Sequence, residues 1–451
     1  MYQVIHHVTF ESLPLELQEE IFFFCLSPFP RFSIKEAPIV LARVCRTWRS
    51  IVLSTPRLWS SFEVEIQGSG ASGLLHDTRL MRRMKLWLER SSSSCCPLSI
   101  RLVYNLVGRV SDDRFSPLFD VLVPETHRWQ HIHFTLPAAS FVKLQPFPPN
   151  SFPMLRSLTL KVVGVRSPSD PPLNILAKNI PWHQLTSLDL QLESNNLPTL
   201  DEGLDILSKT VNLKRSTLQL ECSMDRRNMI RWDKLPLPTI DSLQLILQGT
   251  RKHADPSEVC LAQFLNVLCF SKLRVLHLEW LVNDNMGSWS PVHTDFLAFL
   301  QRSAETLHQL TMTYFPISEN ELLECLLQVP RLTHLDLRFA LNEGANDPVT
   351  DRLLMACTIP SPTISASAAP WTLLPRLEYV NLQCHGKLYT NVTLLALIQS
   401  RWNSSDDRTT RRPLRYFRVL SMKLVSSEVE RHVKGWHEAG LEVDIQCLVV
   451  R

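Results

Sequence analysis

The residues in this chain that are best suited to chemistry do not form a catalytic or metal-binding pattern. His131 and His133 alternate on a predicted strand and present two imidazoles on one side, but no Cys or Asp nearby completes a metal-ligand set. Asp406 and Asp407 are adjacent in a predicted loop, which is typical of a solvated charge pair rather than of an acid–base pair. No Gly-x-x-x-x-Gly-Lys or Gly-x-Ser-x-Gly motif occurs in the sequence. We therefore expect no catalytic residue, no bound metal and no cofactor, and a protein that is not an enzyme.

Cysteine usage and charge limit the compartment and the partners. The 11 cysteines show no zinc-ligand spacing, and several lie in apolar runs, as Cys260 and Cys325 do, which favours free thiols in a reducing compartment, cytoplasmic and/or nuclear. A net charge of +3 is too balanced to indicate nucleic acid. No apolar run reaches the roughly 18 residues of a membrane helix, and no signal peptide is visible. The one basic cluster, read as a solvated loop, is Arg408, Arg411, Arg412, Arg415 and Arg418.

Apolar residues recur at helical spacing near the start of the chain. Ser12 is a suitable N-cap, Pro14 suits the first helical turn, and Pro28 to Pro30 predict the end of this helix. A second helix is predicted after Pro38, closing at Thr55-Pro56. The first stripe is Leu13, Leu17, Ile21 and Phe24, and the second is Leu41, Val44, Cys45, Trp48, Ile51 and Val52. Two short helices bury little surface alone, so these wide stripes predict a surface for another protein.

Three blocks in this segment together resemble the F-box. They are Leu13-Pro14 with Glu16 and Ile21-Phe22, then Val44-Cys45-Arg46 with Trp48, then Pro56 with Leu58-Trp59. The connection between the first block and the second helix is longer and richer in proline than the family pattern. The resemblance implies an F-box module at residues 10–62 that binds the Skp-type adaptor of SCF (cullin–RING) ubiquitin ligases, and through it the cullin and RING subunits. The positions that match its adaptor-binding residues are Leu13, Pro14, Leu17, Ile21, Val44, Cys45 and Trp48. The alternative for Ile21 and Trp48 is that they only hold the core of the module.

Residues 63–125 are assigned to a linker and the N-terminal cap of a repeat array. Glycine and serine mark a linker at 66–77, Leu80 to Leu88 form a helical stripe, and Leu98 to Leu102 alternate as a strand. The stretch from Trp87 to Ser91, with Pro97-Leu98, also resembles the region after the F-box in many fungal F-box proteins.

A Leu-x-x-Leu-x-Leu pattern recurs through residues 126–451, with amphipathic helical stretches between its copies. Successive copies start 25 to 45 residues apart. A repeated strand and helix is the leucine-rich-repeat signature, and the Gly-rich turn of the alternative, a doubly wound sheet, is missing. The copies start at Leu155, Leu185, Ile240, Leu273, Leu307, Leu332, Leu377 and Leu414, with a weaker one at Trp129 and an irregular one at Leu213.

The predicted fold class is a small all-α F-box module followed by an α/β leucine-rich-repeat solenoid, an irregular horseshoe with a parallel sheet on its concave face. A flexible insertion is expected near residues 357–371, where small residues and prolines gather. The repeats at 126–451 then form the substrate-binding domain.

Alternate residues of each predicted strand should point away from the core, so the sequence also predicts the exposed face of the sheet. One exposed row is expected to contain Thr159, Asp189, Gln244, His277, Thr311, Asp336, Asn381 and Arg418. Large polar and aromatic groups concentrate in the C-terminal half and suit recognition better than Ser or Thr. The candidate target-binding residues are His277, Glu279, His334, Asp336, Arg338, Tyr379, Asn381, Tyr416 and Arg418; the alternative is a solvated face with no such role.

Together, these patterns predict a substrate-recognition subunit of an SCF-type ubiquitin ligase, which binds the adaptor through its first helices and an unknown protein target through its repeats. The alternative is an interaction scaffold with the same two parts and no ligase role. Neither nucleic acid nor a membrane is an expected partner.

Overall fold

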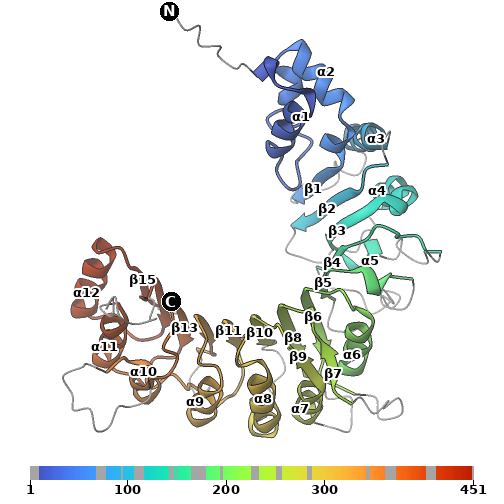
Figure 1. The fold of residues 1–451 in the computed structure, drawn as a ribbon. Coiled ribbons are helices and arrows are strands. Elements are labelled where there is room, and N and C mark those ends of the chain that lie inside the picture. The colour runs from blue at the N-terminus through green and yellow to red at the C-terminus, as the bar shows by residue number, and fades with distance from the viewer. Residues whose placement is uncertain are drawn as a thin grey trace, which may run out of the picture. The chain divides into compact units, whose positions relative to one another are not determined.

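The computed structural model divides into two compact units, residues 1–196 and 197–451, a boundary inside the segment that the sequence assigns to one repeat domain. The fold is α/β, with parallel strands alternating with helices in both units (Figure 1). Within the described ranges, no helix is long and apolar enough to cross a membrane. The structure describes residues 10–67, 78–92, 95–105, 116–141, 147–148, 150–163, 179–192, 197–224, 233–249, 256–281, 287–341, 346–360, 372–402 and 413–448.

The first unit begins with short helices. They are η1 (Phe10–Ser12), α1 (Leu15–Phe24), η2 (Leu41–Arg43), α2 (Arg46–Ser54) and η3 (Pro56–Trp59). The predicted cap at Ser12 is wrong, because Ser12 ends a 3-10 turn and α1 is preceded by Pro14, whose side chain has no polar atom to accept a hydrogen bond from the first turn. The helix also ends at Phe24, ahead of Pro28.

The second predicted helix is interrupted where its sequence looked continuous. The backbone at Cys45 is extended, and its Sγ accepts a hydrogen bond of 3.4 Å from the backbone N–H of Trp48, so Cys45 becomes the N-cap of α2. Side-chain capping of this kind satisfies a free helical N–H and lets a helix restart within one residue. The closure at Thr55-Pro56 is confirmed.

The sheet of the first unit has the order β1-β2-β3-β4-β5, and its neighbouring strands are parallel. Strand β1 occupies residues that the sequence assigns to the end of the helical module and the start of the linker segment; in it, buried Phe62 and Val64 alternate with Glu63 and Glu65. The strands are β1 (Ser61–Gln67), β2 (Leu98–Asn105), β3 (Trp129–Leu136), β4 (Ser157–Val162) and β5 (Ser187–Gln191). The remaining helices are α3 (Thr78–Ser92), α4 (Ser116–Leu122), η4 (Val123–Arg128), α5 (Ala138–Phe141) and η7 (Trp182–Gln184).

Helix α3 joins the N-terminal helices to this sheet. The rings of Trp59 in η3 and Trp87 in α3 meet edge to face at 4.8 Å, and the Trp87 indole N–H donates to the Ser61 carbonyl at 3.0 Å. Met84, Trp87 and Leu88 are buried, as their helical spacing predicted. Aromatic pairs of this geometry stabilise by more than their buried area alone.

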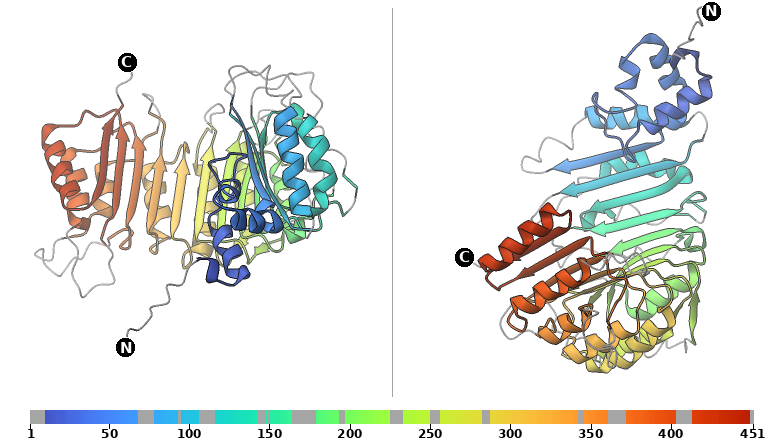
Figure 2. Two further views of the ribbon diagram at one scale, coloured as in Figure 1. Left: turned by 90° about the horizontal axis from the view of Figure 1, so that it is seen from above. Right: turned by 60° about the vertical axis from the view of Figure 1, so that its left-hand side comes forward.

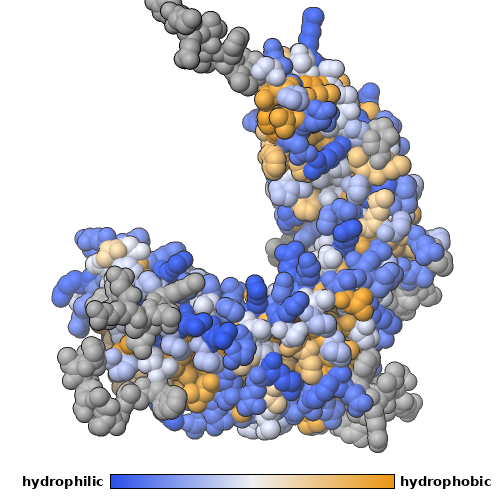
Figure 3. Space-filling view, viewed as in Figure 1, coloured by the Kyte–Doolittle hydropathy of each residue, from blue (hydrophilic) through white to orange (hydrophobic). Residues whose placement is uncertain are grey.

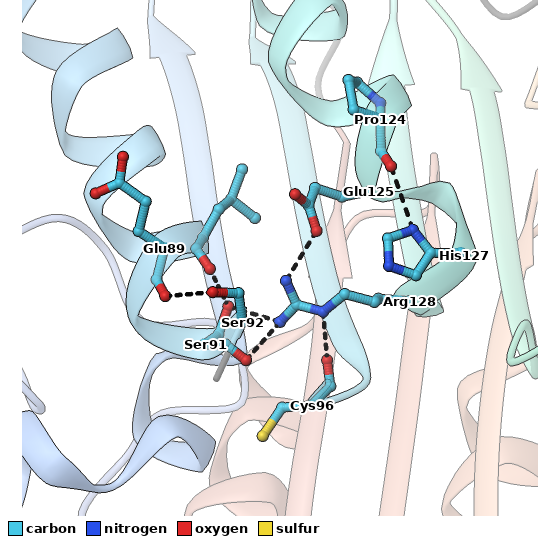
Figure 4. A network of polar contacts seen from close by, with 9 residues as sticks. Glu89, Ser91, Ser92, Cys96, Pro124, Glu125, His127 and Arg128 are labelled. Carbon is cyan, nitrogen blue, oxygen red and sulfur yellow. Dashed lines mark hydrogen bonds and ion pairs between the residues drawn. The ribbon is translucent and has the colours of Figure 1, made fainter. Parts of the chain in front are cut away.

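A buried arginine closes the C-terminal end of α3. Arg128 is 2 % exposed; its Nη2 donates to the Ser91 carbonyl at 2.7 Å and its Nε to the Cys96 carbonyl at 3.0 Å (Figure 4). Its Nη1 pairs with the Glu125 carboxylate at 2.8 Å. The guanidinium thereby satisfies carbonyls at a helix end that otherwise lack donors, and it ties α3 to the start of β2.

The second unit repeats strand and helix in a regular order. Its sheet runs β6-β8-β10-β11-β12-β13-β14-β15, and most of its consecutive helices pack against one another (Figures 1 and 2). The strands are β6 (Arg215–Glu221), β8 (Ser242–Gln248), β10 (Val275–Trp280), β11 (Gln309–Thr313), β12 (His334–Arg338), β13 (Tyr379–Cys384), β14 (Tyr416–Ser421) and β15 (Glu442–Cys447). The helices are α6 (Leu200–Lys209), α7 (Ser257–Val267), α8 (Ser290–Ser303), α9 (Glu319–Leu327), α10 (Asp351–Cys357), α11 (Asn391–Trp402) and α12 (Ser427–Glu438), and β7 (Leu235–Leu237) pairs with β9 (Leu268–Phe270).

The repeat pattern sets the register of this sheet. Leu276 pairs with Leu310 and Leu310 with Leu335, so equivalent positions of neighbouring repeats form continuous buried ladders. Each predicted copy of the pattern falls on a strand. In the irregular copy, Ser216 occupies the buried position that pairs with Leu243. Strand β15 was not predicted.

Helix starts and loop ends are held by local hydrogen bonds. Ser318 and Glu321 form a capping box at the start of α9, and Thr199 and Glu202 form another at the start of α6. Buried Arg401 donates to the carbonyls of Cys357, Leu373 and Leu374, at 2.7, 2.8 and 3.0 Å. Predicted features that lie outside the described residues are 361–371 of the insertion, 68–77 of the linker, and Asp406, Asp407, Arg408, Arg411 and Arg412.

Candidate functional site

The apolar stripe of α1 faces solvent. Leu17 and Ile21, spaced one helical turn apart, are 51 % and 40 % exposed, and Phe24 continues the stripe at 81 %. The opposite face packs inward through Phe22 and Gln18, and the Gln18 amide donates to the Leu13 carbonyl at 2.7 Å. This helix therefore buries a glutamine and leaves its apolar face exposed to solvent.

The break before α2 adds further exposed apolar residues. Val44 is 60 % exposed, Cys45 is exposed, and Trp48 is half-buried. The Trp48 ring lies 4.9 Å from the rings of both Phe10 and Phe22, so this residue also holds the two helices together. The alternative predicted for Trp48 is thus partly true, whereas Ile21 does not belong to the buried core.

Of the seven predicted adaptor-binding residues, none is buried. Pro14 is exposed with Leu17, Ile21, Val44 and Cys45, while Leu13 and Trp48 are half-buried. Figure 3 shows hydrophobic residues gathered on the N-terminal helices. Five further large apolar side chains of this segment are also exposed but were not predicted as contact residues: Leu15, Phe24, Ile34, Val40 and Leu53. The helical period does place Phe24 on the predicted stripe with Ile21, but Phe24 is not among the positions that match the adaptor-binding residues of the F-box.

The sheet of the second unit presents three rows of outward side chains that follow the register. One row contains His277, Thr311, Asp336, Asn381 and Arg418. A second row contains Glu279, Thr313, Arg338 and Gln383, and a third contains His334, Tyr379 and Tyr416. The nine candidate target-binding residues therefore share one face. We call this surface, with all three rows, the sheet face.

Aromatic rings stack along the third row. Tyr379 and Tyr416 lie 4.2 Å apart between centroids with an interplanar angle of 4°, and His334 lies 5.3 Å from Tyr379. Burial lowers the pKa of His334 and raises that of Tyr379, so both rings are uncharged at neutral pH. The stack is a rigid and uncharged part of the sheet face.

A bidentate ion pair occupies the centre of the sheet face. Arg338 donates to both oxygens of Asp336, at 2.9 Å from Nε and 2.7 Å from Nη2, and the Asn381 amide donates to the same carboxylate at 2.9 Å. The hydrogen bond with Asp336, and the nearby carboxylates, raise the pKa of Arg338. Asn381 is only 8 % exposed as a result, so the prediction that it lies exposed is wrong. At the next strands, Arg418 pairs with Asp444 at 3.2 Å.

His277 and Glu279 lie beside this network without joining it. Burial lowers the pKa of His277, with a smaller effect from Arg338, and burial raises the pKa of Glu279. The imidazole Nε2 and the nearest carboxylate oxygen are 3.8 Å apart, which is too long for a hydrogen bond.

The predicted strand histidines of the first unit do not build a metal site. His131 and His133 both point from the outward side of β3, and the His133 Nε2 meets the Thr135 hydroxyl at 3.2 Å. Burial, with Arg101 and Lys161, lowers the pKa of His133 to about 4. Over the described ranges, no group of three His, Cys, Asp or Glu residues is arranged to hold a metal ion.

Compared with known proteins, the chain matches no family model and no curated protein.

Proposed function

We propose that this protein is a substrate-recognition subunit of an SCF-type ubiquitin ligase, in which the N-terminal helices are an F-box module and the strand–helix units are irregular leucine-rich repeats. The observation that carries the proposal is the outward apolar stripe of α1. Leu17 and Ile21 occupy positions that resemble the adaptor-binding residues of the F-box, and both are exposed.

The stripe supports docking to another protein because a soluble chain gains nothing from exposing it. Full burial of a Leu or Ile side chain is worth about 1.5–3 kcal/mol, so several anchors on one short face suffice for specific binding. The Phe10, Phe22 and Trp48 cluster holds the two helices behind the stripe. The adaptor thus meets a preformed surface, which lowers the entropic cost of binding.

The sheet face supports the second half of the proposal. Large aromatic, acidic and basic groups lie there in fixed register on parallel strands, which is the arrangement that presents a rigid recognition surface. In the proposed mechanism, this face binds a protein target while the other subunits of the ligase carry out ubiquitin transfer. The contribution of this chain is proximity, which raises the effective concentration of target lysines near the charged ubiquitin carrier.

The test is capture of a purified Skp-type adaptor by the full chain. A Leu17→Asp, Ile21→Asp double variant is expected to lower the affinity at least about tenfold, because two charges would replace buried contacts worth more than 1.4 kcal/mol. Both side chains are exposed in the free chain, so its melting temperature should not change. The matched control is Ile34→Asp, which is also exposed, at 60 %, but lies outside the predicted set. Equal capture of the double variant and the control would contradict the proposal.

A further inference from the structure

Basic residues gather in the first unit without acidic residues to balance them. Segments 40–60 and 78–92 contain nine basic residues and one acidic residue, Glu89, although the net charge of the whole chain is only +3. Arg57 pairs with Glu20 at 2.5 Å, so its charge is matched within the fold. The basic residues that are exposed and have no ion pair or hydrogen bond among the described residues include Arg49, Arg82, Arg83 and Lys85. Unmatched charges of one sign repel each other in the folded chain and are available to a partner of opposite charge.

Helix α3 sets the spacing of most of these cations. Arg82, Leu86 and Arg90 recur every four residues and are all exposed, so they follow the solvent side of the helix. With a rise of about 1.5 Å per residue, Arg82 and Arg90 are about 12 Å apart along the axis. Arg83 and Lys85, which are also exposed, lie on either side of this line. Helix α3 thus presents a cation at almost every turn of its outer side.

Helix α2 adds a further cation at the end of α3. The Arg90 guanidinium lies over the Trp59 ring, 4.2 Å from its centroid, and this contact fixes its position. Burial lowers the pKa of Arg90, and the positive charge of Arg49 in α2 lowers it further, so the two guanidiniums are close enough to repel each other. We call Arg49, Arg82, Arg83, Lys85 and Arg90 the basic surface.

The composition and place of the basic surface favour a protein with carboxylates. Four of its five cations are arginines, whose planar guanidinium matches a carboxylate with two parallel hydrogen bonds. The basic surface also begins one residue after Trp48, which belongs to the predicted adaptor-binding set. A protein that covers Trp48 would therefore lie against Arg49.

Other polyanions fit this surface less well. The rings of Trp59 and Trp87 are buried, so they offer no platform on which nucleic-acid bases could stack. Among the described side chains of α3, Leu86 is the one large apolar residue that is exposed, whereas a helix bound to a membrane surface needs a whole apolar face.

We infer that the basic surface binds an acidic segment of a protein partner, a stretch rich in Asp and Glu. The inference goes beyond the proposed function, because it requires neither the Skp-type adaptor nor ubiquitin transfer. It rests on that function only in the expectation that a protein occupies the apolar stripe beside the basic surface.

Fluorescence anisotropy of a labelled acidic peptide with the full chain tests the inference. In the probe peptide Glu alternates with Gly, and in the control peptide Gln replaces each Glu. The wild type is expected to bind the Glu peptide at least about tenfold more tightly than the Gln peptide. An Arg82→Glu, Arg83→Glu variant should lower the affinity for the Glu peptide at least about tenfold, because four charges change in favour of repulsion.

The matched control is Lys214→Glu, Arg215→Glu, which reverses two adjacent exposed cations of the second unit and gives the chain the same net charge. It should keep the affinity of the wild type. Both double variants should unfold at the temperature of the wild type, because none of the four side chains has a partner among the described residues.

Three results would overturn the inference: no preference of the wild type for the Glu peptide, an equal loss of affinity in the two double variants, or displacement of the bound peptide more readily by a single-stranded oligonucleotide or by phosphatidylserine vesicles of equal charge than by unlabelled Glu peptide. Adaptor capture separates this outcome from the proposed function. A chain that captures the adaptor through Leu17 and Ile21 but shows no preference for the Glu peptide would end the inference and leave the ligase proposal standing.

Discussion

Two arginines are among the most deeply buried side chains of this protein, and both act on backbone carbonyls. Arg128 and Arg401 are each 2 % exposed, and each donates to carbonyls at points where a helix ends or a loop returns. A guanidinium has five donors in a fixed plane, so one side chain can satisfy several carbonyls that no regular structure reaches. Sequence reasoning could not find either residue, because the carbonyls that they bind are 27 to 44 positions away.

The first prediction concerns Arg128. Replacing it with alanine should lower the free energy of unfolding by about 3 kcal/mol, because the Ser91 and Cys96 carbonyls and the Glu125 carboxylate lose their donor inside the protein. Arg331→Ala, which breaks an exposed pair with Glu305, should cost less than about 1 kcal/mol. Urea unfolding of both variants measures the difference, and similar losses would show that the buried network is not stabilising.

The second prediction concerns pH and His133. Burial, Arg101 and Lys161 lower its pKa from 6.5 to about 4, so between these values the unfolded chain binds a proton that the folded chain excludes. The free energy of unfolding should therefore be complete above pH 6.5 and fall as the pH is lowered toward about 4. His133→Gln should make this decline shallower, as followed by unfolding titrations from pH 7 to pH 4. A slope identical to that of the wild type would contradict the assignment.

At the scale of elements, the spacing of apolar residues predicted most of the helices and strands. The prediction failed where the same spacing is compatible with two different local conformations. The Leu-x-x-Leu-x-Leu copies became strands because alternation and burial agree there. Leu41 to Val52 also had a single helical period, yet the chain breaks at Cys45, because a side-chain cap competes with helix continuation. In β1 the alternation was visible, but a nearby glycine-rich stretch led to its assignment as a linker.

In the candidate sites too, the placement of residues could be predicted from the sequence, whereas the pairing of their side chains could not. Which residues lie on the sheet face followed from their period of two, since a strand alternates sides. The burial of Asn381 did not follow, because it depends on the hydrogen bonds that Asp336 accepts from Arg338 and from the Asn381 amide. Such pairings are set by side-chain geometry between neighbouring strands, which no local pattern encodes.

The third prediction concerns the start of α9. Ser318→Ala should lower the free energy of unfolding by about 1 kcal/mol, because the free N–H of Glu321 loses its cap and the Glu321 carboxylate loses the Ser318 hydroxyl. The control is Ser427→Ala, at an exposed position inside α12, one residue after the cap. Thermal unfolding of the two variants decides, and a loss that is the same for both would argue against the capping box.

At the scale of the molecule, each strand of the second unit depends chiefly on the strands beside it. Stability in such arrays is close to a sum of unit and neighbour contributions, so damage to one strand should spread outward along the array.

The fourth prediction tests this with Leu335, a buried residue in the ladder of β12. Leu335→Ala should cost about 2–5 kcal/mol, and amide exchange should quicken first in β11, β12 and β13. Gln309→Ala, on the outward side of β11, should change exchange little. Uniformly faster exchange across the whole unit would instead indicate that it opens as one block.

The constant register of the strands has a consequence for how this protein can change. Because inward and outward positions alternate without a register shift from β8 to β15, outward residues can be exchanged at little energetic cost to the leucine ladders behind them. A new ligand preference can then arise by single substitutions of outward residues, while the fold stays the same.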